Sequence, residues 1–135
     1  MFSKSTEYAL RASIYIAQNA SNKKKVSIQS IANGINAPKP FTAKIMQILA
    51  SKQNNLVVSY PGPTGGFYMT EEAKDLPVFA VIKAMNDSHV VESCLLGISD
   101  CSDENPCQIH FEYKGIKKML LALLKEKTIR ELSRK

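Results

Sequence analysis

Three cysteines and one histidine carry the chemistry that stands out in this sequence. Cys94, Cys101 and Cys107 lie within fourteen residues of one another, and the other 121 of the 135 residues include no cysteine. His110 follows the last cysteine after a gap of two residues. Thiolate and imidazole groups are the ligands that iron and zinc favour in proteins. The cluster therefore indicates a metal site, a thiol switch or a set of buried cysteines.

The spacing alone leaves these alternatives open. Structural zinc sites usually contain two cysteines with two to four residues between them, whereas the gaps here are six and five residues. A thiol switch needs a lowered thiol pKa, and the acids in this loop are expected to raise it. Incidental cysteines are usually buried and seldom gather on a polar loop. An odd number of cysteines argues against a disulfide framework.

The charge is distributed unevenly along the chain. Its net value is +6, and residues 1–70 contain eight Lys or Arg but one acid, Glu7, whereas residues 71–135 contain ten Lys or Arg and eleven acids. The first half is therefore predicted to bind a polyanion. The sequence contains no phosphate-binding loop, paired carboxylates or Cys-His-acid pattern, so we do not expect an enzyme. With neither a signal peptide nor a membrane-spanning run in the pattern, we expect a cytoplasmic protein.

Two short helices that follow a first helix predict a helix-turn-helix. The first helix is expected over residues 6–20, the second from the N-cap Ser27 to Gly34, and the third from Pro40 at its first position. We expect the third helix to turn Phe41, Ile45, Ile48 and Leu49 toward the core and Thr42, Ala43, Lys44 and Gln47 outward. In a helix-turn-helix the later helix of the pair, here the third helix of the chain, enters the major groove of DNA.

A hairpin is predicted directly after the third helix. The β-rich runs 56–60 and 67–70 flank the glycine-rich segment 61–66, which is typical of the wing of a winged helix. The fold class is therefore mainly α with a small β-hairpin, an α+β winged helix-turn-helix. The DNA-binding domain is expected to span residues 1–86.

The second half is predicted to combine a loop with a long helix. A structural helix starting near Pro77 ends the first domain, and a sensor loop of residues 87–108 contains the cysteines. Apolar residues then recur at helical spacing from Cys107 to about Lys127, which favours a long helix that pairs with its twin. Residues 128–131 resemble a capping box that opens a last short helix. We therefore expect residues 109–135 to form a dimerisation helix and a C-terminal cap.

Several short motifs together resemble the Rrf-two family of bacterial winged-helix regulators. They are Tyr8-Ala-Leu-Arg-Ala, Ile31-Ala, Phe41-Thr-Ala-Lys-Ile-Met-Gln-Ile-Leu and Gly62-Pro-Thr-Gly-Gly-Phe, followed by the clustered cysteines. The resemblance covers essentially the whole chain and implies a homodimer that binds a palindromic operator in double-stranded DNA. Many members carry an arginine before the first wing glycine, and here that residue is Pro61.

The resemblance also implies a cofactor and a set of site residues. An iron-sulfur cluster would be held by Cys94, Cys101 and Cys107, with His110 as fourth ligand of a [2Fe-2S] cluster, as in IscR-type members, or Glu7 of the partner on a [4Fe-4S] cluster, as in NsrR-type members. Operator binding would then respond to iron-sulfur status, redox conditions or nitric oxide. The expected DNA contacts are Ser27, Lys39, Thr42, Lys44, Gln47, Tyr60 and Thr64. The alternative is a cofactor-free repressor that responds to a partner or a small effector.

Overall fold

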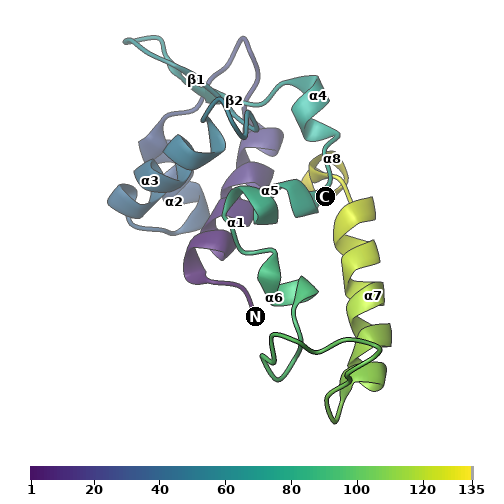
Figure 1. Ribbon diagram of the computed structural model, residues 1–135. Helices are drawn as coiled ribbons and strands as arrows, with labels where there is room; N and C mark the ends of the chain where they lie inside the picture. The colour runs from purple at the N-terminus through teal and green to yellow at the C-terminus, as the bar shows by residue number, and fades with distance from the viewer. Residues whose placement is uncertain (135) are drawn as a thin grey trace.

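A computed structural model describes residues 1–134 of the chain, and α1 forms its centre. Helix α1 spans Lys4–Asn19 and starts at Ser3, whose side chain accepts a hydrogen bond from the Thr6 backbone N–H. One face of α1 is buried through Ala9, Ala12 and Ile16. Helices α2 and α3 and, from the far end of the chain, α8 pack around α1 (Figure 1).

The predicted helix-turn-helix is present, with shifted boundaries. Helix α2 spans Ile28–Ile35 and is capped by Ser27, and α3 spans Lys39–Leu49, so that Pro40 occupies its second position and not the first. The expectation that Gly34 ends α2 is wrong, because Asn36 takes the left-handed conformation there, with φ of 54°. Gly34 lies inside the helix, where a Cβ atom would overlap the ring of Tyr15.

The hairpin forms the predicted wing. Strands β1, Val58–Tyr60, and β2, Gly66–Tyr68, pair antiparallel with Ser59 opposite Phe67. Val26 adds an isolated bridge to the same sheet by exchanging two backbone hydrogen bonds with Phe67, at 3.0 and 2.8 Å. The lysine-rich segment before Val26 is therefore fixed beside the wing.

The chain then passes through three short helices to the cysteine loop. The helix expected to start near Pro77 is α5, Val78–Ala84, which Pro77 caps in an extended conformation, and a separate short helix, α4 at Glu71–Lys74, precedes it. A further short helix, α6 at His89–Glu92, lies at the start of the segment expected to be a loop. Figure 1 shows the loop after α6 at the end of the molecule away from the wing.

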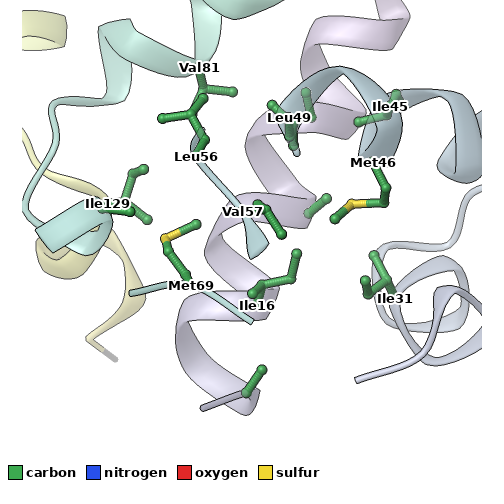
Figure 2. Packing of buried hydrophobic residues seen from close by; sticks show 14 of the residues in the cluster. Ile16, Ile31, Ile45, Met46, Leu49, Leu56, Val57, Met69, Val81 and Ile129 are labelled. Carbon is green, nitrogen blue, oxygen red and sulfur yellow. The ribbon is translucent and has the colours of Figure 1, made fainter. Parts of the chain in front are cut away.

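Two C-terminal helices complete the fold. Helix α7 spans His110–Glu126, and α8 spans Ile129–Ser133 after the predicted capping box between Thr128 and Glu131. Ile129 is buried in the core with Ile16, Val57 and Met69 (Figure 2). The end of the chain is thereby packed against the first half of the chain.

Helix α7 has two apolar surfaces with different environments. Tyr113, Leu120 and Leu124 are half-buried on the side that packs against α5 and α6. A second row remains exposed and consists of Ile109, just before the helix, with Ile116, Met119 and Leu123. Of the helices in residues 1–134, none is long and apolar enough to cross a membrane.

Candidate metal centre and nucleic-acid interface

The fold brings the three cysteines together at the base of α7. Cys94 follows α6, Cys101 lies at a turn in the loop, and Cys107 precedes α7. Their three Sγ atoms all lie within 4.8 Å of one another, and those of Cys94 and Cys107 are 3.7 Å apart. All three cysteines are half-buried, so solvent still reaches the group. This arrangement can hold a metal ion or a metal cluster.

His110 completes the group from the first turn of α7. Its Nδ1 lies 3.2 Å from Cys101 Sγ, and its Nε2 lies 2.7 Å from Asp103 Oδ1. The other carboxylate oxygen of Asp103 accepts a hydrogen bond of 2.6 Å from Lys114 Nζ. The Lys114 ammonium, and next His110, hold the pKa of Asp103 below its ordinary value. His110 was predicted from the sequence, whereas Asp103 and Lys114 were not; the position of Lys114 one helical turn after His110 was the available signal.

The loop backbone changes the acidity of the thiols. Hydrogen bonding from the Ile98 backbone N–H, followed by that of Leu96, lowers the pKa of Cys94 to about 7. The expectation that the acids of this loop raise the thiol pKa is therefore wrong for Cys94, where the backbone donors outweigh the opposing effect of burial. For Cys101 the Cys107 backbone N–H lowers the pKa, but burial and the neighbouring thiols outweigh it, and the net shift is upward.

A cavity of about 620 Å³ opens beside the cysteines. Its lining includes Cys94, Cys101 and His110, together with His89, Glu92 and Lys117. Lys117 Nζ donates to the Glu92 backbone carbonyl at 3.2 Å, which joins α7 to the end of α6. A group bound by the cysteines would therefore be reachable by small molecules from solvent.

Glu7 lies outside this group within a single chain. Its carboxylate is half-exposed and lies 3.6 Å from Lys4 Nζ. Within residues 1–134, the ligand atoms that gather within 4.8 Å of one another come from the three cysteines and not from Glu7. Two other residues at the start of α1 contact the segment before α6, since Ser3 N and Thr6 Oγ1 both donate to Asp87 Oδ2.

Helix α3 presents most, but not all, of the predicted DNA contacts. Lys39, Lys44 and Gln47 are exposed, and Ser27 is exposed at the start of α2. The expectation that Thr42 contacts DNA is wrong, because its side chain is fully buried and its hydroxyl donates to the Pro38 carbonyl at 3.0 Å. The buried residues of α3 are Thr42, Ile45, Met46 and Leu49, whereas Phe41 and Ile48, expected in the core, are 54% and 37% exposed.

The wing presents Tyr60 and a lysine that the sequence analysis did not single out. Tyr60 is 57% exposed, and Thr64 is exposed at the tip. Lys25 Nζ lies 4.8 Å from the centre of the Tyr60 ring and 5.6 Å from that of Tyr68. The run Lys23-Lys24-Lys25 was visible in the sequence, but its place beside the wing depends on the Val26 bridge. The exposed residues of α3 and the wing thus form a basic surface with few acids.

Comparison with known proteins agrees with this geometry. The sequence profile of the Rrf2 family, described as an iron-dependent transcriptional regulator, matches residues 2–135. The chain belongs to the Rrf2 family. An HTH-type transcriptional regulator of Aquifex aeolicus is 33% identical over 134 residues, which cover 98% of this chain and 90% of that protein. IscR of Yersinia pestis is 31% identical over 81 residues, 60% of this chain and 49% of its own length.

Solved structures of Rrf2 regulators share the fold of this chain. CymR of Bacillus subtilis, described as a global cysteine regulator, superimposes with a TM-score of 0.75 at 20% identity and covers 98% of this chain and 95% of its own. IscR of T. potens superimposes with a TM-score of 0.69 at 21% identity, covering 98% and 85%. The predicted resemblance to the Rrf-two family and the winged-helix fold class are therefore confirmed. This Rrf2 protein is accordingly a transcriptional regulator.

Proposed function

We propose that this Rrf2 regulator binds an iron-sulfur cluster at Cys94, Cys101 and Cys107, and that the cluster changes its affinity for a palindromic operator. The observation that carries the proposal is the convergence of three half-buried Sγ atoms within 4.8 Å. The IscR relatives of this chain add support to the choice of cofactor.

The donor set fits an iron-sulfur cluster. Three sulfur atoms supply soft ligands, and the backbone donors that lower the pKa of Cys94 to about 7 also favour the thiolate that binds iron. When bound, the cluster would supply chemistry that responds to oxidants and nitric oxide. The neighbouring cavity gives such small molecules a route to the ligands.

His110 is the fourth ligand in this proposal. Its Nδ1 lies 3.2 Å from Cys101 Sγ, and its side chain is 13% exposed. The alternative is Glu7 contributed by a second copy of the chain. Iron content and spectra distinguish these two ligands. If His110 is the fourth ligand, His110→Ala should perturb the cluster; if Glu7 of a second copy is the fourth ligand, Glu7→Ala should perturb it.

Two further surfaces supply DNA binding and dimerisation. The proposed operator contacts on α3 are Lys39, Lys44 and Gln47, and those on the wing are Tyr60 and Thr64. Ser27, at the start of α2, is proposed to contact the DNA backbone. The exposed row on α7 spaces Ile109, Ile116 and Leu123 by seven residues, the repeat at which two helices pair. A homodimer would place two α3 helices on the half-sites of a palindrome.

The test is anaerobic purification with iron and sulfide analysis, followed by DNA binding. The probe is a duplex enriched from a random library by the purified protein, measured with the cluster present and after its removal. We expect matched iron and sulfide, an absorption band at about 400–450 nm, and different dissociation constants for the two forms. Replacing all three cysteines by serine should abolish both the cluster and the difference in DNA affinity between the two forms. A colourless protein that cannot be reconstituted, with unchanged binding in the triple variant, would instead indicate the cofactor-free repressor.

A further inference from the structure

A carboxylate supports His110 from the side opposite the cysteines. Asp103 Oδ1 lies 2.7 Å from His110 Nε2, so this nitrogen is the one that carries the ring proton and donates it to the carboxylate. In that tautomer Nδ1 has a free lone pair, and Nδ1 is the atom that faces Cys101 Sγ at 3.2 Å. The ring is thus oriented with its ligating nitrogen toward the thiols.

We propose that Asp103 is a positioning residue that fixes the orientation and tautomer of His110 for cluster binding, with Lys114 anchoring the carboxylate. This inference rests on the proposed function. Histidines that bind metals commonly donate their other ring N–H to a carboxylate, which fixes the ring and raises its basicity as a ligand. Lys114 lies four residues after His110 on α7, and neighbours at this spacing share one face of a helix.

The loop itself holds Asp103 in place. Ser102 and Asn105 exchange two backbone hydrogen bonds of 3.2 Å around it, and Asn105 Nδ2 donates to Asp100 Oδ2 at 3.2 Å. The Asp103 and Lys114 side chains are each 51% exposed, compared with 13% for His110. Exposed ion pairs contribute little to folding stability. Orientation of the histidine is therefore a better account of this pair than stabilisation of the fold.

The experiment compares Asp103→Ala with Glu104→Gln, which removes a neighbouring exposed acid without touching His110. Each protein is reconstituted anaerobically, and iron and sulfide per chain, iron loss to a chelator and nitrogen hyperfine coupling of the reduced cluster are measured. We expect Asp103→Ala to take up the cluster, to lose iron about 10-fold faster or more, and to show an altered nitrogen coupling. Glu104→Gln should match the wild type in all three measurements.

A His110→Ala background separates positioning from a general effect on the loop. There, adding Asp103→Ala should change the rate of iron loss no further, because Asp103 acts through the imidazole. An equal effect in both backgrounds would overturn the inference, as would a wild-type cluster without nitrogen coupling or an Asp103→Ala protein that behaves like Glu104→Gln. A wild type that binds no iron and sulfide would overturn the proposed function itself, which is a distinct result.

Discussion

Thr6 and Asp87 are joined by a buried hydrogen bond of 2.8 Å between side chains that lie 81 residues apart in the sequence. The same carboxylate oxygen accepts the Ser3 backbone N–H at 3.0 Å. Ser3 and Thr6 open α1, and Asp87 lies two residues before α6, which leads to Cys94. This contact therefore ties the central helix α1 to the segment that enters the cysteine loop.

Asp87→Asn should lower the free energy of unfolding at pH 7 by about 1–3 kcal/mol, because the charged acceptor of one buried and one partly buried hydrogen bond is lost. The Ser3 backbone N–H, with Thr6, lowers the pKa of Asp87 below its ordinary 3.8. A lowered pKa stabilises the folded state above the unfolded pKa, and this contribution disappears as the pH falls through the folded value. Urea unfolding at fixed protein concentration should therefore show a difference between variant and wild type that shrinks below about pH 4.

Glu104→Gln is the control for this measurement, since Glu104 is an exposed acid of the cysteine loop. Its stability should equal that of the wild type at each pH. A difference for Asp87→Asn that persists unchanged at pH 2 would show that the charge of Asp87 does not contribute.

Thr42→Val should reduce stability and leave operator selectivity unchanged, because the buried hydroxyl donates to Pro38 and does not face DNA. Its methyl replacement leaves the packing volume almost intact, so we expect a loss of about 1 kcal/mol. Gln47→Ala is the matched change on the exposed side of α3. It should leave stability nearly constant and relax base preference in a selection from random duplexes. Relaxed preference in Thr42→Val would contradict the buried placement.

Lys25→Met should weaken DNA binding and reduce its dependence on salt. The ammonium lies near Tyr60 and Tyr68, and we expect it to contact a phosphate beside the wing. Loss of one phosphate contact lowers the slope of log affinity against log salt by about 1. Fluorescence anisotropy with the selected duplex at several salt concentrations measures this slope. Lys127→Met, at the end of α7, removes the same charge and should keep the wild-type slope; equal slopes in both variants would exclude a contact by Lys25.

Met119→Glu should weaken dimerisation at least tenfold, which corresponds to about 1.4 kcal/mol. Met119 is 75% exposed in the middle of the apolar row on α7, and pairing of two such helices would bury the new carboxylate. Sedimentation equilibrium measures the dissociation constant. The adjacent Lys118→Glu places the same acid one residue away, outside the row, and should have a much smaller effect. A monomeric wild type, or equal weakening by both variants, would contradict pairing through this row.

Local patterns were sufficient for much of this protein. The N-cap at Ser27, the capping box at Thr128, the glycine-rich wing and the long α7 each depend on neighbours in sequence, and all are present. The family motifs, spread over the chain, were also readable without a structure. Helix boundaries were less predictable: Gly34 indicated the end of a helix, yet α2 ends at the left-handed Asn36, and Gly34 lies within the helix where the Tyr15 ring leaves no room for a Cβ atom.

The sequence by itself determined the fold class, the family and the three cysteines as a candidate ligand set, because these depend on residue types and short spacings. Tertiary structure decided which side of α3 is buried, placing Thr42 in the core and Phe41 outside it. It also decided that Asp103 supports His110 and that Lys25 lies beside the wing. These relationships join residues through the packing of helices and the pairing of Val26 with Phe67, and the direction of a side chain across such contacts is not encoded in local periodicity.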